Sequence, residues 1–433
     1  MARGLFPVTL SLTLVALLAG CSKSGEAEPS ATATAKPSKI SFMIFGDPGE
    51  HEAYKNLVKA YETKHSGAKV ELIHIPSQGD YRKRLGADFA ANTPADVVLI
   101  NYRRYAQFAA KGVVEPLGPY LEKSSLIKKE DFYGEAIRPF VFKGELYGIP
   151  QNLSSLVVYY NKNLFDEAGL PHPKSTWTWD EFVSTAKMLT KDRDGDGKMD
   201  VYGLGTEVSL QRLIPFVWQA GGEIVDDAEN PTSLNLGDPG FQKALQWFID
   251  LRAVHKVIPD QVEEKSEDSE TRFQNGRTAM FLNSRRGVPT YREITGFEWD
   301  VVALPVGKQA AGILHADAYF MPKAAKDKAA VWKFIEFANS KEGQEIVAAS
   351  GRTVPSIRAV AESQAFLDPS QKPANSKVFL ETLPTMRAVP VNENWVDLES
   401  TATEELERAV YSGLKASEVT KTLKERTDGV LAK

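Results

Sequence analysis

The stretch that organises the chain runs from residue 144 to residue 182 and reads GELYGIPQNLSSLVVYYNKNLFDEAGLPHPKSTWTWDEF. Residues 156–160 are rich in β-branched and aromatic side chains, so they predict a buried strand, and Gly169 ends a short helical turn after it. Thr178 and Glu181 fit a capping box at the start of an amphipathic helix. We therefore expect one α/β lobe before this stretch and a second lobe after it.

The first residues predict an export signal rather than a part of the fold. Arg3 precedes an uncharged stretch over residues 4–20, which ends in Leu17-Leu-Ala-Gly-Cys21. Cys21 is the only cysteine, so an intramolecular disulfide is excluded. Leu-Ala-Gly-Cys resembles the bacterial lipobox, which implies cleavage before Cys21 and lipidation of its thiol; the alternative is a signal peptide with an incidental cysteine. Residues 22–38 are Ser, Ala, Thr, Pro, Glu, Lys and Gly without apolar periodicity, which predicts a disordered tether.

Composition excludes several classes of function. The full chain of 433 residues carries a net charge of −5, and no basic stripe interleaved with aromatic residues indicates nucleic-acid binding. The sequence contains no Gly-x-Ser-x-Gly elbow, no His-Glu-x-x-His motif and no Walker loop. No catalytic constellation therefore stands out, and the chain is long enough for two domains with substantial cores.

Strand-like and helix-like segments alternate in the part that follows the tether. Residues 40–45, 70–75 and 96–101 predict strands, with helices over residues 54–61 and 82–90 between them. This alternation favours parallel βαβ units in a twisted sheet. Because ligands bind beyond the carboxyl ends of such strands, the residues to consider are those directly after them: Gly46 and Asp47, Asn101 to Arg104, and Gln151 to Ser155.

Eight short segments follow one another along the chain: Asn92-Thr-Pro-Ala-Asp-Val-Val98, Ala110-Lys-Gly-Val-Val-Glu-Pro-Leu117, Leu146-Tyr-Gly-Ile-Pro150, Tyr160-Asn-Lys162, Thr178-Trp-Asp-Glu181, Gln219-Ala-Gly-Gly-Glu223, Phe273-Gln-Asn-Gly-Arg-Thr-Ala-Met280 and Trp299-Asp-Val-Val-Ala-Leu-Pro305. In this order they resemble segments of the family 1 extracellular solute-binding proteins, relatives of maltose-binding protein. One segment alone would be a weak signal, but eight in order are specific. The resemblance implies the sugar-capturing component of an ATP-driven importer.

The resemblance also implies the organisation of the chain. It is an α/β, two-lobed periplasmic-binding-protein fold, in which each lobe is a twisted, mostly parallel sheet flanked by helices. The hinge is crossed about three times, near residues 148–150, 304–305 and 352–355. The expected boundaries are 1–20 for the signal peptide, 21–38 for the lipidated cysteine and tether, 39–149 with 304–352 for the N-terminal lobe, and 150–303 with 353–433 for the C-terminal lobe.

Sugars are bound by aromatic side chains that stack on the sugar ring and by planar polar side chains that hydrogen-bond to its hydroxyl groups. By resemblance, the candidate ligand-binding residues are Asp47, Asn101, Tyr102, Arg103, Gln151, Asn152, Gln211, Arg212, Trp218, Asn283, Arg285, His315, Asp317 and Trp395. Asn283 and Arg285 fall where maltose binders place a stacking tryptophan, so that aromatic is missing here. Trp395 matches the position of another stacking tryptophan; the alternative is that it fastens the last helices to the core. Trp218 fits a cleft wall or the core equally, and His315 fits a ligand contact or a structural role equally.

Residues 191–200 form the one candidate metal site. Asp192, Asp194 and Asp196 stand at positions 1, 3 and 5 of an EF-hand-like loop, the Lys198 carbonyl at position 7 and Asp200 at position 9. Gly203 occupies position 12, where the bidentate glutamate is expected. The loop therefore predicts either a structural calcium ion or a solvated acidic turn, and no cofactor is required for function.

The expected partners are a carbohydrate or related small solute and the membrane permease subunits of an ABC importer. We expect a monomer in the cell envelope, held at the membrane by the lipid anchor only and without nucleic acid. Because Arg103, Arg104, Arg212, Arg285 and Arg286 make the predicted cleft more cationic than plain sugar requires, the alternative ligand is an acidic or phosphorylated solute such as a uronate or a glycerophosphodiester. Other small solutes, such as a polyamine or an amino acid, would change only the cleft, and an exported glycoside hydrolase is the remaining alternative.

Overall fold

The first of the two large β-sheets is formed mainly by the N-terminal part of the chain. The computed structural model describes residues 38–432, so the predicted signal peptide, Cys21 and nearly all of the tether lie outside it. The sheet has five strands in the order β2-β1-β3-β13-β6. β1 (Ser38–Phe45), β2 (Ala68–Ile75) and β3 (Val97–Asn101) pair in parallel, whereas β13 (Asp317–Phe320) runs antiparallel to β3 and to β6 (Ile149–Pro150).

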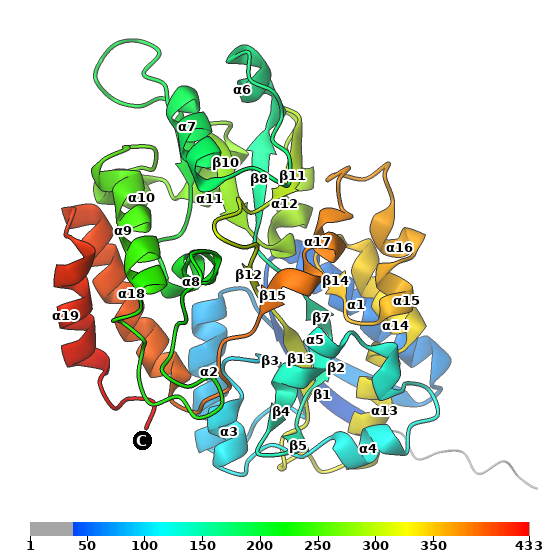
Figure 1. Ribbon diagram of the computed structural model, residues 1–433. Helices are drawn as coiled ribbons and strands as arrows, with labels where there is room; N and C mark the ends of the chain where they lie inside the picture. The colour runs from blue at the N-terminus through cyan, green and yellow to red at the C-terminus, as the bar shows by residue number, and fades with distance from the viewer. Residues whose placement is uncertain (1–37, 433) are drawn as a thin grey trace, which may run out of the picture. The chain divides into compact units, whose positions relative to one another are not determined.

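The helices between these strands confirm the predicted βαβ units. α1 (Pro48–Lys64) connects β1 to β2, and α2 (Gln78–Ala90) connects β2 to β3. Asp47 begins α1 as its N-cap, because its carboxylate accepts the backbone N–H of Glu50 at 2.8 Å. α13 (Lys328–Ala338) and α14 (Lys341–Ala349) return from much later in the sequence to pack against α1 (Figure 1).

The second sheet has four strands in the order β11-β8-β10-β9. β8 (Val157–Asn161) is the strand predicted from the opening stretch, and all five of its residues are buried. The expectation of mostly parallel pairing is wrong here: β8 runs antiparallel to both β10 (Thr278–Asn283) and β11 (Trp299–Ala303), and only β9 (Tyr202–Gly205) pairs in parallel with β10. The reason is that β8 and β11 connect to the first sheet through short extended segments rather than through crossover helices.

Helices pack around the second sheet and on one another. The capping box at the start of α7 (Trp179–Leu189) is confirmed, since the Thr178 backbone N–H donates to Glu181 at 2.7 Å and the Glu181 N–H donates to Thr178 at 3.2 Å. α8 (Leu210–Gln219) and α9 (Pro239–Ala253) pack on α18 (Trp395–Ser412), and α19 (Ala416–Thr427) packs on α18. This group of helices stands together at one side of the ribbon (Figure 1).

Three short segments carry the chain between the two sheets. β6 of the first sheet is followed by β7 (Asn152–Leu153) and then by β8, and β11 of the second sheet leads through β12 (Gly312–Ile313) to β13. The third lies between α16 and α17: β14 (Val354–Pro355) pairs with β7, and the helices that follow it, α15 (Arg358–Ala361) and α16 (Gln364–Leu367), still contact α14, whereas α17 (Val378–Glu381) contacts β11 of the second sheet. At the first segment the backbone is tightly packed, because a Cβ atom on Gly148 would lie 2.7 Å from Cζ of Phe320.

The remaining elements are short. The α-helices are α3 (Ala106–Ala110), α4 (Gly118–Glu122), α5 (Gly134–Ile137), α6 (Lys162–Glu167), α10 (Gln261–Ser266), α11 (Ser269–Gln274), α12 (Val288–Arg292), α15 (Arg358–Ala361), α16 (Gln364–Leu367) and α17 (Val378–Glu381); the strands are β4 (Val141–Phe142), β5 (Glu145–Leu146) and β15 (Met386–Arg387); and the 3₁₀ turns are Lys129–Asp131, Arg138–Phe140, Arg285–Gly287 and Leu383–Thr385. α15 and α16 contact α14, so this part of the chain beyond residue 353 packs with the first sheet's helices. Among residues 38–432, no helix combines the length and apolar composition that a membrane span requires.

Candidate functional site

A cleft of about 700 Å³ is lined by residues of the first sheet, by the segments that follow β9 and β10 of the second sheet, and by helices around both sheets. Asn101 lies at the carboxyl end of β3, Asp317 begins β13, and Asn152 lies in β7. On the side of the second sheet, Gln211 and Arg212 belong to helix α8. The cleft therefore lies where the sequence predicted it, beyond the carboxyl end of a parallel strand.

The first-sheet side of the cleft is a connected polar network around Asp317. The Asp317 carboxylate accepts from Nδ2 of Asn101 at 3.1 Å and from Nδ2 of Asn152 at 3.4 Å. The Asn101 carbonyl oxygen in turn accepts from Nε of Arg103 at 3.0 Å. Each amide is thus held in one orientation, which presents donors and acceptors to the cleft in fixed positions.

The Glu399 carboxylate links residues on opposite sides of the cleft. Nη1 of Arg103 lies 3.4 Å and Nη2 of Arg104 3.3 Å from it, and both arginines follow β3. On the other side, Nε2 of Gln211 donates to Glu399 at 2.6 Å and the Trp395 indole N–H donates to it at 3.1 Å. Burial would raise the pKa of Glu399, but the two guanidinium groups lower this pKa below its ordinary value, so the carboxylate is ionised.

A second ion pair lies at the start of α8. Nη2 of Arg212 is 2.9 Å and Nη2 of Arg286 is 3.1 Å from the Glu207 carboxylate. Arg286 also lies 3.6 Å from Glu270. The neighbouring Arg212 lowers the pKa of Glu207 below its ordinary value. Both arginines are therefore partly neutralised by the protein's own carboxylates.

His315 lines the cleft between β12 and β13. Its backbone N–H donates to Ser154 at 2.8 Å, and its carbonyl accepts from Ser154 at 2.7 Å, which fixes the segment. Burial, together with the positive charges of Arg103, Arg212 and Arg286, holds the pKa of His315 well below its ordinary value. The imidazole is consequently neutral at physiological pH.

The structure brings together seven of the predicted ligand-binding residues in this cleft: Asn101, Arg103, Asn152, Gln211, Arg212, His315 and Asp317. It places the other seven elsewhere. Asp47 is used as the cap of α1. Tyr102 is fully buried, and its hydroxyl accepts the Val389 N–H at 3.1 Å.

Three more of the predicted polar residues are used within the interior. The Arg285 side chain is buried, donates to the Gly351 carbonyl and to Ser376 at 2.8 Å each, and packs on two phenylalanine rings. Asn283 is fully buried and donates to the Tyr291 hydroxyl at 2.7 Å. Gln151 is buried, and its side-chain oxygen accepts from the amide of its neighbour Asn152.

The two predicted tryptophans are also core residues in this structure. Trp218 is 1% exposed, and the guanidinium of Arg387 lies 4.7 Å from its ring centroid. Trp395 is fully buried and acts on the cleft only through its hydrogen bond to Glu399. The aromatic residues that do line the cleft, Phe45, Tyr81 and Phe108, are each less than a tenth exposed. The cleft wall therefore exposes little aromatic surface.

Sequence reasoning missed several lining residues. Gln78, Tyr81, Arg82 and Leu85 lie on one face of α2, and their i, i+3, i+4, i+7 spacing could have indicated it. Glu207, Arg352 and the α18 face with Glu399, Ser400, Thr403 and Glu404 also line the cleft. These residues carried no signal of their own, because their proximity depends on how distant segments pack.

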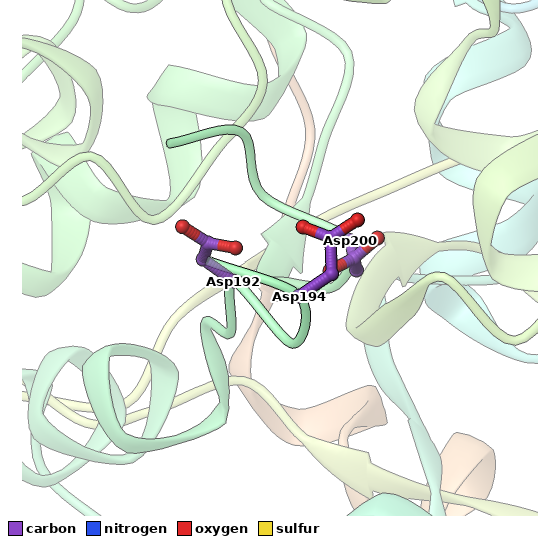
Figure 2. A group of neighbouring side chains, drawn as sticks. All are labelled: Asp192, Asp194 and Asp200. Atoms are coloured by element: carbon purple, nitrogen blue, oxygen red, sulfur yellow. The ribbon is translucent and has the colours of Figure 1, made fainter. Parts of the chain in front are cut away.

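The acidic loop after α7 brings three carboxylates together, away from the cleft. Oxygens of Asp192, Asp194 and Asp200 lie within 4.8 Å of one another, and Figure 2 shows the three side chains on this single loop. Asp192 already accepts the backbone N–H groups of Gly195 at 2.7 Å and Gly197 at 2.9 Å. Asp196 is not part of this group, and its carboxylate accepts the Lys198 N–H at 2.8 Å. Calcium binding by this loop stays a prediction.

Two sheets joined by short crossing segments, with one polar cleft lined from both, define a solute-binding protein. The chain belongs to the bacterial extracellular solute-binding protein family, whose profile matches residues 47–345. Members of this family are binding proteins rather than enzymes.

Individual relatives agree with this assignment. A putative binding protein of Brucella abortus is 25% identical over 88% of this chain and 90% of its own length. A maltooligosaccharide ABC transporter solute-binding lipoprotein of Streptococcus pneumoniae is 24% identical over 82% of this chain and 81% of its own. An ABC substrate-binding protein of Listeria monocytogenes, solved in complex with cycloalternan, superposes with a TM-score of 0.84 at 25% identity and covers 91% of this chain and 99% of that one. The α/β two-lobed expectation is confirmed.

Proposed function

We propose that this protein captures a sugar or oligosaccharide in the cleft between its two sheets and delivers it to the permease of an ABC importer. The observation that carries the proposal is the convergence of paired donors and acceptors from both sides on one cleft. The relatives with assigned ligands support it, because the maltooligosaccharide lipoprotein and the cycloalternan complex are both carbohydrate binders.

The chemistry of the cleft suits hydroxyl groups. A sugar hydroxyl donates one hydrogen bond and accepts others, so it pairs best with side chains that are fixed in both roles. Asp317 accepts, Asn101 and Asn152 donate and accept, and Gln211 is oriented by Glu399. Since these groups come from both sides of the cleft, a bound ligand would favour closure of the two lobes around it, with the short crossing segments acting as the hinge.

The carboxylates argue against hydrolysis of the bound sugar. A glycosidase needs one carboxyl group with a raised pKa as general acid. In this cleft the pKa of Glu207 is lowered by Arg212, and that of Glu399 is lowered by Arg103 and Arg104 in spite of burial. Both groups are held ionised, which is the wrong state for protonating a leaving group. The states of these two groups support binding of the ligand without turnover.

Thermal unfolding in the presence of neutral mono- and oligosaccharides tests the proposal. A ligand at a hundred times its Kd stabilises the folded state by about 2.7 kcal/mol. At an unfolding entropy of about 2.1 cal mol⁻¹ K⁻¹ per residue this raises Tm by about 3 °C. The matched variant Asp317→Ala, which removes the acceptor of two amides, should reduce the shift. Release of shorter sugars, or no shift with any carbohydrate, would contradict it.

The envelope location is the second part of the proposal. A lipidated Cys21 would hold the monomer at the membrane beside its permease, while the folded part remains free to bind solute. In cell fractionation we expect the wild-type chain in the membrane fraction and Cys21→Ser, carrying the same fold, in the soluble exported fraction. An equal distribution of the two chains would show that the thiol anchors nothing.

A further inference from the structure

Two buried arginines of the cleft have guanidinium N–H groups for which the described part of the chain provides no hydrogen-bond acceptor. Arg103 is 6% exposed and Arg212 is 3% exposed, and both line the cleft. Nη1 of Arg103 and Nε of Arg212 have no hydrogen-bond partner within residues 38–432. The nearest carboxylate oxygen to Nη1, on Glu399, is 3.4 Å away and out of line for a hydrogen bond. Unsatisfied buried donors of this kind call for an acceptor from a ligand.

A third unsatisfied group lies in the same cleft. Nε2 of His315 has no partner in the described part of the chain, and the imidazole is electrostatically coupled to Arg103, Arg212 and Arg286. These groups come from three separate segments: the turn after β3, helix α8 and the segment between β12 and β13. An acceptor between them would therefore be held from both sides of the cleft.

The protein's own carboxylates are already engaged and cannot fill this role. Glu399 contacts Arg104, Gln211 and Trp395 in addition to Arg103. Glu207 binds the Nη2 atoms of Arg212 and Arg286, not Nε of Arg212.

One further arginine of the cleft lacks a counter-charge. Of the six arginines in the lining, Arg103 and Arg104 pair with Glu399, Arg212 and Arg286 pair with Glu207, and Arg352 pairs with Glu50. Arg82 is exposed at the cleft and forms no ion pair with any residue in the range 38–432. The wall offers almost no exposed aromatic face, so stacking on aromatic rings contributes little to recognition. Guanidinium donors of this kind bind carboxylate and phosphate most strongly.

We propose that the cleft holds an anionic group, a carboxylate or a phosphate ester on a polyhydroxylated ligand, at a subsite formed by Arg103, Arg212 and His315. The anion accepts from Nη1 of Arg103, Nε of Arg212 and the Nε2–H tautomer of His315, while the hydroxyls of the ligand meet the Asp317 network. The inference rests on the proposed function, since it names the class of sugar that the same cleft selects.

Calorimetric titration of the wild-type protein with matched ligand sets tests this directly. The probes are glucose, glucuronate and glucose 6-phosphate, with the galactose equivalents, and maltose as a neutral oligosaccharide. We expect an acidic member to bind at least about tenfold more tightly than its neutral counterpart, which is about 1.4 kcal/mol. Comparison of glucuronate with glucose 6-phosphate distinguishes a carboxylate ligand from a phosphate ester. Inorganic phosphate alone should compete with the acidic ligand.

Variants then locate the subsite. The preference is the Kd of the neutral ligand divided by the Kd of its acidic counterpart. In Arg103→Gln and in His315→Ala this ratio should fall by at least about tenfold from its wild-type value. Arg84→Gln is the matched control, because Arg84 pairs with Asp88 on the exposed face of α2. Should Arg103→Gln fail to fold, the wild-type ligand series still decides.

The outcomes separate the two proposals. Neutral sugars that bind as tightly as acidic ones, or more tightly, overturn the anion subsite and leave sugar capture standing. Absence of binding by every carbohydrate overturns both. Preference for the acidic ligand that survives in both variants also overturns the assignment to Arg103 and His315.

Discussion

Glu399→Gln is the substitution with the largest effect that the structure predicts. The change keeps the size of the side chain and the acceptor for Gln211 but removes the negative charge between the guanidinium groups of Arg103 and Arg104. Removing one partner of a buried ion pair costs about 3–5 kcal/mol, because the other charge stays buried. Since the amide still accepts hydrogen bonds, we expect the lower end, about 3 kcal/mol.

Urea unfolding of the wild-type and variant proteins measures this loss. In thermal unfolding it corresponds to about 4 °C at an unfolding entropy of about 2.1 cal mol⁻¹ K⁻¹ per residue. The matched control is Glu404→Gln on the same helix, whose side chain is 66% exposed and pairs with Arg426. An exposed pair of this kind contributes less than about 1 kcal/mol.

The pH dependence supplies a second check. The pKa of Glu399 is lowered in the folded protein, so the charge stabilises it above the unfolded value of 4.5 and this stabilisation is lost as pH falls through the folded pKa. The difference between wild type and Glu399→Gln should therefore shrink in acid. Equal losses in Glu399→Gln and Glu404→Gln at neutral pH would refute the reasoning, since they would show that Glu399 does not bridge the cleft.

Three further predictions concern stability. Burial raises the pKa of Glu50, which pairs with Arg352, to about 7, so the folded state binds this proton more readily than the unfolded state. The free energy of unfolding should therefore fall by about 2–3 kcal/mol between pH 4.5 and pH 7. In urea titrations Glu50→Gln should flatten this pH dependence. If the acidic loop binds calcium, added calcium raises Tm and a chelator lowers it, and Asp192→Asn abolishes the difference; no calcium effect on the wild type would favour the solvated turn. Gly148→Ala should cost about 1–3 kcal/mol because its Cβ would meet Phe320, and an unchanged urea midpoint would contradict the close packing there.

The fold was predictable where local sequence determines it. Alternating strands and helices indicated the parallel strands β1, β2 and β3, and the Thr178 capping box located the start of α7. The direction of β8 was not predictable from periodicity, because a buried apolar strand has the same pattern in parallel and antiparallel sheets. The antiparallel pairing of β8 with β10 and β11 follows instead from the short connections between the sheets.

The cleft was predictable to the extent that it follows strand ends. Asn101, Arg103 and Asn152 come directly after or within such segments, and the structure places them on the cleft. The direction in which Tyr102 and Trp395 point could not be read from the sequence, since neighbouring residues in a turn face different ways and a helix start can face core or cleft. Glu399 carried no signal at all, because its partners Gln211, Arg104 and Arg103 lie 188 to 296 residues away in the chain.

A crystal structure of the protein with the sugar that gives the largest rise in Tm shows whether a carbohydrate is held in the cleft between the two sheets. We expect an intact ligand between Asn101 and Asp317 on one side and Gln211 and Arg212 on the other. A ligand bound outside this cleft, or one found cleaved within it, would overturn the proposed function.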